Sequence, residues 1–452
     1  MIQKNALINE FSQKASENKA AYFIGAGISI PYGLPNFENL IRELAKGRID
    51  LTIKSNHNFP EIAQYILNAS SQDKSLILKQ IQSRFTITYD NTKSTYLDFI
   101  AKSNVSTIWT TNFDTLIEQS LDSCGKRYVS KNTDTDFKKE FETTNSSEVL
   151  KIHGDIYNND IVIAKNDYED FNLTHPVTIR RLEQDLLTKS LLFIGYSYKD
   201  PNIQSIINNV RQLTEGKSKN RHYMILSPEK KKNNKKLQEL WIQDLERYGI
   251  HVYLLEKGFT ELAEILEKIC LKSKGKSVFV TGSHYDTSNK TAKKLGKQLH
   301  KIDNLILNYG QSEGIGKTVC SSYAQKCIKS AEQLPSHIRI FANPYSFCDK
   351  WDNQDALLGQ LTAFREELLS KTQIMVVFPG KKGTLAEVQI GLKKGVVIVP
   401  VFYNDDEFKT EILKYPEILS TLEKHAKFYV KKLLKNSVGV DDIILCLESI
   451  LK

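Results

Sequence analysis

Residues 20–29, AAYFIGAGIS, decide the fold of the first part of the chain. Residues 20–24 are apolar and predict a buried strand, which Gly25 and Gly27 interrupt before a helical pattern begins further on. A strand that leads through a glycine turn into a helix is typical of a pyrophosphate site, because glycines admit the phosphates and free N–H groups and the helix dipole favour negative charge. Two glycines alone also fit an ordinary tight turn, so the downstream sequence has to decide between these interpretations.

Three further apolar segments end in polar residues. The expected strands and the residues that follow them are 105–109 with Asn112, 149–152 with His153, and 191–194 with Ser197. In open α/β sheets, ligands bind outside the carboxyl ends of the strands, at the point where the strand order reverses. We therefore expect these three polar residues and Gly25 to meet at one edge of a sheet and to form a ligand site.

The spacing of the patterns predicts an α/β protein with two domains. Short apolar strands separated by helical stretches indicate a doubly wound parallel sheet, and the charged stretch 271–276 interrupts this rhythm before it starts again. We predict a Rossmann-like domain over residues 1–272 and a second Rossmann-like domain over residues 277–452. Strands are expected in addition at 223–226, 252–255, 278–280, 305–307, 338–341, 374–378 and 396–401.

Two local predictions complete the first domain. Residues 38 to about 100 carry apolar residues at helical spacing, which predicts a helical layer beside the sheet. The apolar run at 161–163 predicts a hairpin.

Composition excludes several classes of protein. A chain of 452 residues with 40% hydrophobic and 25% charged residues is typical of a globular protein of two or three domains. No segment has the roughly 18 to 20 consecutive apolar residues that span a bilayer, and residues 1–19 are too polar for a signal peptide. We expect a cytoplasmic protein without a membrane partner.

Charge and cysteine content argue against nucleic acid and against a metal. The net charge is +9, but the lysines are dispersed, and the densest run, residues 229–236, lacks aromatic residues and predicts a solvated loop. No two cysteines form a CxxC pair, so neither a zinc ribbon nor a redox dithiol is indicated, and we expect reduced core residues. The six cysteines are Cys124, Cys270, Cys320, Cys327, Cys348 and Cys446.

Four motifs of the first domain resemble, in the same order, the fingerprint of the sirtuins. They are GAGIS at 25–29, GLPNF at 33–37, TTNFD at 110–114 and IHG at 152–154. The resemblance covers about residues 20–205, and GYSYKDPNI at 195–203 is similar to the variant found in bacterial sirtuin-like NAD-consuming domains. It implies a sirtuin-like Rossmann domain that binds NAD.

The resemblance also implies a role for each matching residue. The pyrophosphate turn matches Gly25, Ala26, Gly27 and Ser29; the nicotinamide ribose site matches Asn112 and Asp114; the general base matches His153; and Ser197 is a candidate contact to the dinucleotide. The residue types suit the chemistry, because breaking the bond between nicotinamide and ribose needs an oriented nucleophile and a proton acceptor. An imidazole accepts a proton near neutral pH, and an amide orients water or ribose without adding charge.

The sequence also departs from sirtuin deacylases. There is no cysteine between His153 and Leu191, where those enzymes carry a four-cysteine zinc module, and Thr111 replaces the usual glutamine. The loop that holds an acyl-lysine peptide has no counterpart. These losses favour water as the acceptor, and therefore hydrolysis of NAD+ to ADP-ribose and nicotinamide without zinc or another metal.

Two alternatives stay open. One is a zinc-free sirtuin-like deacylase or ADP-ribosyltransferase. The other is a nucleotide sensor without catalysis, which the pairing of Asn112 with His153 argues against, because a protein that only binds needs no base.

The second domain contains two glycine-rich loops. Residues 309–318 approach a P-loop pattern, but Gln311 stands where that pattern needs glycine, which argues against ATP hydrolysis. Residues 378–387, FPGKKGTLAE, resemble the nucleotide-binding motif of the SLOG superfamily, with Lys381 in place of the second glycine. A cation at that position favours tight binding of an anionic nucleotide over turnover.

Seven residues of the second domain are candidate contacts to that nucleotide. They are Gly282, Ser283, Arg365, Lys381, Lys382, Gly383 and Glu387. The alternative for Arg365 is an exposed arginine on a helix surface.

A sirtuin-like domain followed by a SLOG domain resembles the ThsA-type effectors of Thoeris antiphage defence. That resemblance implies a bacterial NAD hydrolase that depletes cellular NAD. It further implies a TIR-domain partner protein whose product, a cyclic ADP-ribose isomer, binds the SLOG domain as activator. It also implies a homotetramer or larger assembly.

Overall fold

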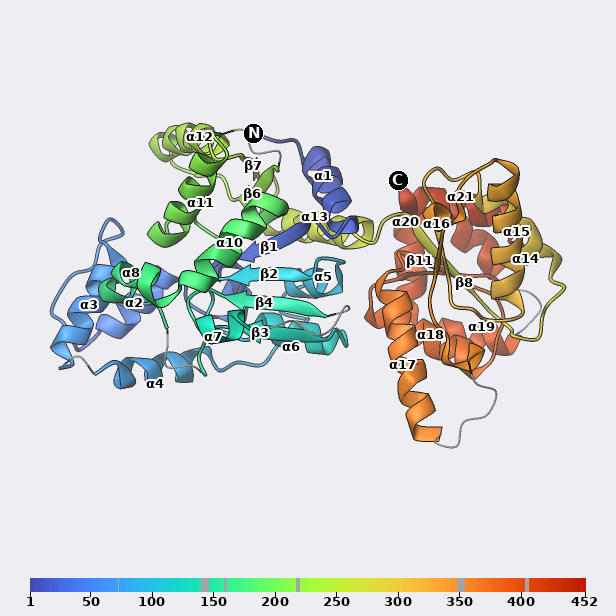
Figure 1. The fold of residues 1–452 in the computed structure, drawn as a ribbon, viewed down its shortest axis with the longest axis horizontal. Coiled ribbons are helices and arrows are strands. Elements are labelled where there is room, and N and C mark those ends of the chain that lie inside the picture. The colour runs from blue at the N-terminus through green and yellow to red at the C-terminus, as the bar shows by residue number, and fades with distance from the viewer. Residues whose placement is uncertain (72, 140–145, 158–160, 217–219, 348–353, 403–405) are drawn as a thin grey trace. The chain divides into compact units, whose positions relative to one another are not determined.

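The chain divides into two compact units, Met1–Ser273 and Lys274–Lys452, each with its own parallel sheet (Figure 1). The computed structural model describes all residues except 72, 140–145, 158–160, 217–219, 348–353 and 403–405. Cys348 thus lies outside the described residues. No helix among those described combines the length and apolar character needed to cross a bilayer.

Unit 1 is built on a seven-stranded sheet of order β3-β4-β2-β1-β5-β6-β7, in which every pairing is parallel. The strands are β1 (Ala20–Ile24), β2 (Thr107–Thr110), β3 (Tyr128–Lys131), β4 (Ser147–Lys151), β5 (Ser190–Ile194), β6 (His222–Leu226) and β7 (Ile250–Leu254). The predicted doubly wound parallel sheet is confirmed. Its strand order reverses between β1 and β5, so the ligand-binding switch point lies beside the AAYFIGAGIS stretch.

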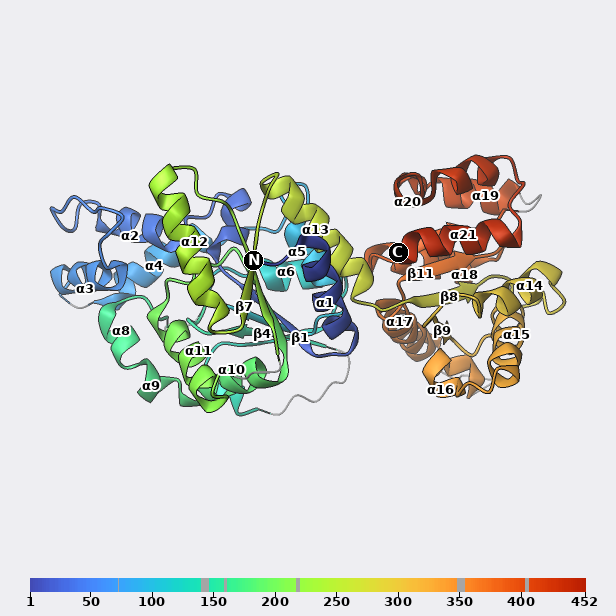
Figure 2. The ribbon, with the colours of Figure 1, turned by 90° about the horizontal axis from the view of Figure 1, so that it is seen from above.

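Helices cover both faces of this sheet. Successive side chains of β1 point to opposite faces, so this buried apolar strand contributes to a core on each side. Tyr22 and Ile24 pack into one core with apolar residues of α1, α2, α3, α4, α5, α6 and α13, whereas Ala21 and Phe23 pack into a second core with α10, α11 and α12. Figure 2 shows α5 and α6 on the opposite side of the strands from α10 and α11. The helices of unit 1 are α1 (Lys4–Ser16), α2 (Phe37–Ala45), α3 (Phe59–Ala69), α4 (Lys74–Phe85), α5 (Tyr96–Lys102), α6 (Leu116–Ser123), α7 (Asp134–Phe137), α8 (Lys165–Glu169), α9 (Phe171–Thr174), α10 (Pro176–Thr188), α11 (Pro201–Leu213), α12 (Lys232–Glu246) and α13 (Phe259–Lys272).

The helical layer after residue 38 is confirmed, whereas the predicted hairpin at 161–163 is wrong and one strand was not predicted. Residues 161–163 are buried but form no strand. The N–H of Val162 donates to the carbonyl of His153, and the N–H of Ile163 donates to the Asp167 carboxylate. These two N–H groups therefore stabilise a loop and do not pair with a second strand. Conversely, β3 was not expected, because this short edge strand is half exposed and lacks an apolar run.

The glycines of the opening stretch are needed because two backbone turns touch. Gly25 N–H donates to the Ile194 carbonyl (3.0 Å) and Gly27 N–H to the Gly195 carbonyl (2.9 Å). A Cβ at Gly25 would lie 2.5 Å from the Gly195 oxygen, and one at Gly27 would lie 2.7 Å from its Cα. The turn after β1 therefore packs directly on the turn after β5.

This packing uses the N–H groups that the sequence suggested were free. Besides the two glycines, Ile28 N–H bonds to the Gly25 carbonyl and Ser29 N–H to the Ala26 carbonyl. Only short 3-10 turns follow, at residues 26–28 and 30–32, and α2 begins at Phe37. The prediction of a helix dipole at this turn is wrong, because the first α-helix after it begins at Phe37, and four of the turn's N–H groups are bonded within the protein rather than free.

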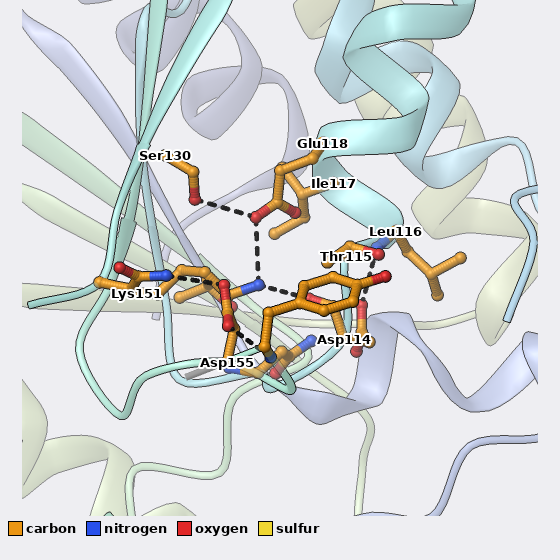
Figure 3. Close-up of polar contacts among 12 residues, drawn as sticks. Asp114, Thr115, Leu116, Ile117, Glu118, Ser130, Lys151 and Asp155 are labelled. Carbon is orange, nitrogen blue, oxygen red and sulfur yellow. Dashed lines mark hydrogen bonds and ion pairs between the residues drawn. The ribbon is translucent and has the colours of Figure 1, made fainter. Parts of the chain in front are cut away.

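A buried ion pair fixes the next two strand ends. Lys151, the last residue of β4, is fully buried, and its Nζ donates to the Asp114 carbonyl (2.6 Å) and to Glu118 Oε1 (3.1 Å). Ser130 Oγ donates to the same Glu118 oxygen (3.1 Å), as Figure 3 shows. The contacts join the turn after β2 and helix α6 to the strand end two residues before His153.

Unit 2 repeats the architecture with five parallel strands in the order β10-β9-β8-β11-β12, which confirms the predicted second α/β fold. The strand order reverses between β8 and β11. Its strands are β8 (Ser277–Thr281), β9 (Ile306–Tyr309), β10 (Ile338–Ile340), β11 (Ile374–Val377) and β12 (Val397–Pro400). Its helices are α14 (Lys290–Leu299), α15 (Ile315–Lys329), α16 (Leu334–His337), α17 (Gln354–Ser370), α18 (Lys382–Lys393), α19 (Asp406–Leu413), α20 (Pro416–Leu434) and α21 (Val440–Leu451).

We expect Gly27→Ala to lower the free energy of unfolding by about 1–3 kcal/mol, the usual range for overpacking, because the new methyl group meets backbone that cannot rotate away. Urea unfolding followed by circular dichroism measures the change. Gly359→Ala is the control: its Cβ meets open space on α17, so this change should be neutral or stabilise by up to about 1 kcal/mol. Equal effects of the two substitutions would contradict the close approach of the turns.

Lys151→Met should lower the free energy of unfolding by about 3–5 kcal/mol, because it leaves the Glu118 carboxylate buried without its cation. Adding Glu118→Leu should recover part of that loss, since an apolar pair replaces the buried ion pair. Lys102→Met is the matched control, because Lys102 pairs with Asp98 where both are partly exposed, and its loss should cost less than about 1 kcal/mol. A loss at Lys151 no greater than that of the control would show that the buried pair does not hold the strand ends.

Candidate active site

A cavity of about 610 Å³ opens at the carboxyl ends of β1, β2, β4 and β5, within the size range of small-molecule sites. Seven of the predicted site residues line it: Ala26, Gly27, Ser29, Asn112, Asp114, His153 and Ser197. The eighth, Gly25, lies behind them and accepts a hydrogen bond from Asn112. The opposite wall comes from α2, α3 and the turns before them, including Phe37, His57 and Phe59.

A chain of hydrogen bonds orients the Asn112 side chain. Its Nδ2 donates to Ser29 Oγ (3.1 Å) and to the Gly25 carbonyl (3.3 Å), and Ser29 Oγ donates to Asp114 Oδ2 (2.9 Å). Because both amide hydrogens face protein acceptors, the position of Oδ1 is set. Asn112 Oδ1 is buried and has no hydrogen-bond partner among the described residues, so it is an acceptor for a ligand hydroxyl or for water.

The His153 ring lies against a carboxylate. Its Nε2 is 3.1 Å from Asp200 Oδ2, both side chains are buried, and the contact is close without the alignment of a hydrogen bond. Asp200 is fixed by its other oxygen, which caps α11 by accepting from the N–H groups of Asn202 (3.0 Å) and Ile203 (3.1 Å). Because a carboxylate only accepts, its closeness favours the imidazole tautomer with the hydrogen on Nε2, which leaves the lone pair on Nδ1.

Two buried tyrosines complete this wall. The Tyr168 ring meets His153 edge to face, with 5.6 Å between centroids, and the Tyr196 hydroxyl is buried without a hydrogen-bond partner in the described part of the chain. Burial, and secondarily the charge of Asp200, raises the pKa of both phenols well above the usual value. Both hydroxyls are therefore neutral at physiological pH and can donate hydrogen bonds.

Sequence reasoning placed the strand ends correctly but missed Asp200, Tyr168, Tyr196 and Lys199, all of which line the cavity. One signal was available, since aspartate directly before Pro201 is a strong helix N-cap pattern. This pattern predicts where α11 begins. The approach of the second Asp200 oxygen to His153, in contrast, depends on tertiary packing. Ser197 is exposed at the cavity rim.

In unit 2, the candidate nucleotide contacts gather at the switch point between β8 and β11. Ser283 N–H donates to the Pro379 carbonyl (2.9 Å), which joins the two turns. Gly282 is needed there, because a Cβ would lie 2.7 Å from the Cβ of Phe378. Lys381 and Lys382 are exposed at the start of α18.

The Glu387 carboxylate lies between two of these elements. Thr281 Oγ1 donates to its Oε2 (2.5 Å), and Arg365 Nε lies 3.8 Å from its Oε1. Burial raises the pKa of Glu387 above its usual value, although Thr281 and Arg365 oppose this. A Cβ at Gly383 would lie 3.5 Å from the Arg365 guanidinium. Arg365 is four-fifths buried rather than a freely exposed helix arginine.

The glycine-rich loop at residues 309–318 does not form a phosphate site through Lys317. Lys317 Nζ is bound by both oxygens of Glu313 (2.8 and 2.9 Å) on the exposed surface of α15. This agrees with the argument from Gln311 against a P-loop.

Two protein families match the chain in tandem. The SIR2-like domain family matches residues 106–253, and the Sir2- and TIR-associating SLOG family matches residues 261–452. The matched ranges fall on the two sheets in the order expected from the motifs.

Curated relatives match both halves together. An NAD(+) hydrolase ThsA of Bacillus cereus (strain MSX-D12) is 27% identical over 425 residues, which are 87% of this chain and 86% of the relative. An NAD(+) hydrolase ThsA of Acinetobacter baumannii (strain 532279) is 28% identical over 402 residues, covering 84% of this chain and 80% of the relative. Defense-associated sirtuin 2 of Bacillus subtilis is 25% identical over 222 residues, 47% of this chain and 21% of that protein. The chain is thus a SIR2-like unit followed by a SLOG unit, and it is similar over most of its length to bacterial proteins named NAD(+) hydrolase ThsA.

Proposed function

We propose that the chain hydrolyses NAD+ to nicotinamide and ADP-ribose in the cavity of unit 1. The observation that carries this proposal is the pair of groups at the strand ends: a buried amide oxygen without a partner and an imidazole held against a carboxylate. Both lie at the edge of the sheet where open α/β folds bind nucleotides. The relatives named NAD(+) hydrolase support the same reaction.

The proposed reaction breaks the bond between the nicotinamide nitrogen and the ribose carbon, and the bonding electrons leave with nicotinamide. Water supplies the oxygen that bonds to that carbon and releases one proton. Asn112 Oδ1 orients the water or a ribose hydroxyl, and His153 accepts the proton through Nδ1. Asp200 stabilises the imidazolium that forms, as the third member of a catalytic triad does. This chemistry requires no metal, and we propose none at this site.

Recognition of the dinucleotide follows from the same lining. Lys199 at the rim provides a positive charge for the pyrophosphate, and the Tyr196 hydroxyl is a neutral donor inside the cavity. The turn at Gly25, Ala26 and Gly27 brings the Ser29 side chain to the dinucleotide, with Asp114 behind it and Ser197 at the entrance.

We further propose that the activity serves antiphage defence by depleting NAD in the bacterial cytoplasm, and that unit 2 controls it. In this proposal a TIR-domain partner supplies a cyclic ADP-ribose isomer, which binds at Gly282, Ser283, Arg365, Lys381, Lys382, Gly383 and Glu387. The family description, Sir2- and TIR-associating, and the cationic side chains at this switch point support an anionic nucleotide from such a partner. The activator must bind the active state more tightly than the resting state, and a homotetramer or larger assembly would transmit the difference.

Incubation of the purified full-length protein with NAD+ tests the reaction. Nicotinamide and ADP-ribose are quantified by chromatography, with and without cyclic ADP-ribose isomers and with an acyl-lysine peptide. Asn112→Ala and His153→Ala should each reduce nicotinamide release by about 100-fold or more, because each removes a group that acts on the nucleophile. Asn68→Ala, an exposed asparagine at the end of α3, is the control and should leave the rate unchanged.

The arms of this experiment separate the alternatives. Intact NAD+ under every condition would exclude hydrolysis. Release that depends on the peptide would favour a deacylase, and an unchanged rate with every isomer would exclude the proposed activator. Wild-type rates in both variants would place the chemistry elsewhere.

Asp200→Asn tests the role of the carboxylate beside His153. The asparagine oxygen still caps α11, but its NH₂ group donates toward Nε2 and favours the other imidazole tautomer. We expect kcat to fall by about 100-fold or more with little change in KM or in unfolding, by analogy with the catalytic triad, where this substitution costs about 10⁴. Asp73→Asn, at the exposed N-cap of α4, is the matched control and should leave kcat unchanged. Equal kcat values for Asp200→Asn and the unmodified protein would show that Asp200 acts only as the N-cap of α11.

A further inference from the structure

Four side chains with metal-binding atoms converge in unit 2, at the edge of the sheet opposite the candidate nucleotide contacts. His300 directly follows α14, Cys327 lies in the last turn of α15, Glu332 lies between α15 and α16, and His337 ends α16. The next residue after His337 begins β10, so the cluster lies where strands begin rather than where they end. The proposed function assigns no role to these residues.

The atoms are already close to one another. His300 Nε2 is 3.0 Å from Glu332 Oε2, and His337 Nε2 is 3.4 Å from the same oxygen. Ligand atoms of His300, Cys327 and Glu332 all lie within 4.8 Å of one another. Tetrahedral zinc with bonds of about 2.0–2.3 Å needs ligand atoms roughly 3.3–3.7 Å apart. Three of the groups therefore already lie near the spacing of a zinc site, and the fourth, His337, contacts the Glu332 oxygen that they share.

The Tyr323 hydroxyl sets the orientation of one imidazole. It donates its hydrogen to the Leu305 carbonyl (3.0 Å), so its oxygen can only accept from His337 Nδ1, at a longer 3.5 Å. The neutral His337 ring thus carries its hydrogen on Nδ1 and directs the lone pair of Nε2 toward Glu332. Metal-binding histidines are usually held in this manner, with the second ring nitrogen donating to a neighbouring acceptor.

The alternative is an ion pair between Glu332 and a protonated histidine. It explains the His300 and His337 contacts, but it leaves the fully buried Cys327 with only a hydrogen bond to Glu332 and one to Tyr323. A neutral thiol is a weak hydrogen-bond donor, whereas a thiolate is a strong zinc ligand. One thiolate, one carboxylate and two neutral imidazoles also balance the charge of a divalent cation, so the complete site would be neutral.

We propose that His300, Cys327, Glu332 and His337 bind one zinc ion that fastens α14, α15 and α16 together. A mixture of sulfur, nitrogen and oxygen donors favours zinc over calcium or magnesium. Four protein ligands fill a tetrahedral shell, which makes the site structural rather than catalytic. The ion can enter from solvent, because both histidines are 23% exposed and Glu332 is 35% exposed. The sequence alone predicts a protein without metal, because it has neither a CxxC pair nor the four-cysteine module of sirtuin deacylases. The proposed zinc site combines residues at four separate positions of the chain and departs from that prediction.

Zinc binding by the full-length protein tests the proposal directly. The protein is dialysed against EDTA and titrated with zinc against a chromophoric chelator, and the bound metal is counted by mass spectrometry. We expect one zinc ion per chain and a higher melting temperature with zinc. Cobalt in place of zinc should give the absorption band of a cobalt–thiolate bond, which reports on Cys327 itself.

Variants identify the ligands. Cys327→Ser and His300→Gln should each weaken zinc binding by more than tenfold and abolish the effect of zinc on the melting temperature. Tyr323→Phe should weaken binding by about 10–100-fold, the usual effect of removing the partner of a metal-bound histidine. Cys446→Ser, which removes a buried thiol from α21 of the same unit, is the control and should bind zinc like the unmodified protein.

Two results would overturn the proposal. One is the absence of bound zinc in the folded, unmodified protein. The other is equal zinc affinity in the unmodified protein and in His300→Gln, whose partly exposed side chain can be replaced without opening the core. Neither measurement depends on NAD+ hydrolysis, so the test stands apart from the proposed function.

Discussion

The direct contact between the turns after β1 and β5 is the constraint on which the rest of unit 1 depends. Both turns contain glycine where they meet, because a single added Cβ would lie within 2.7 Å of the opposing backbone. The contact closes the sheet at its switch point and brings Ser29 and Asp200, from opposite sides of that point, to one cavity. The two glycines, whose pattern suggests a phosphate site, are thus required for the packing of the two turns. They contribute to binding only by placing other residues at the cavity.

Buried polar contacts then fix each side chain of the site from behind. Lys151 links the turn after β2 to the end of β4, Ser29 links Asn112 to Asp114, and Asp200 links His153 to the start of α11. The Lys151 and Ser29 contacts satisfy groups that would be costly to bury alone, which ties the geometry of the site to the stability of the fold. Such a site is rigid on its sheet side before any ligand arrives, as preorganised catalysis requires.

Much of this organisation could be predicted from the sequence, because parallel strands place their carboxyl ends at one edge. Asn112 and His153, 41 positions apart by their residue numbers, were expected to meet there, and both line the cavity. Local sequence patterns gave wrong predictions where tertiary packing determines the secondary structure. The apolar run at 161–163 is buried without a sheet partner, and β3 forms from residues of mixed polarity. Side-chain geometry was also out of reach, since no spacing rule gives the approach of Asp200 to His153 or the pairing of Arg365 with Glu387.

The cavity of unit 1 has two walls of different origin, which can change independently in sequence. Strand ends and their buried polar contacts make one wall, whereas α2, α3 and the turns around Phe37 and His57 make the other. The second wall belongs to a helical layer outside the sheet ladder, so its side chains can be exchanged without disturbing a strand pairing. In the proposed reaction, the groups that break the bond and the helices that could select the ligand therefore belong to separate parts of the fold. A chain built in this way can acquire a new preference among nucleotides by altering the helical wall while its reactive groups stay in place.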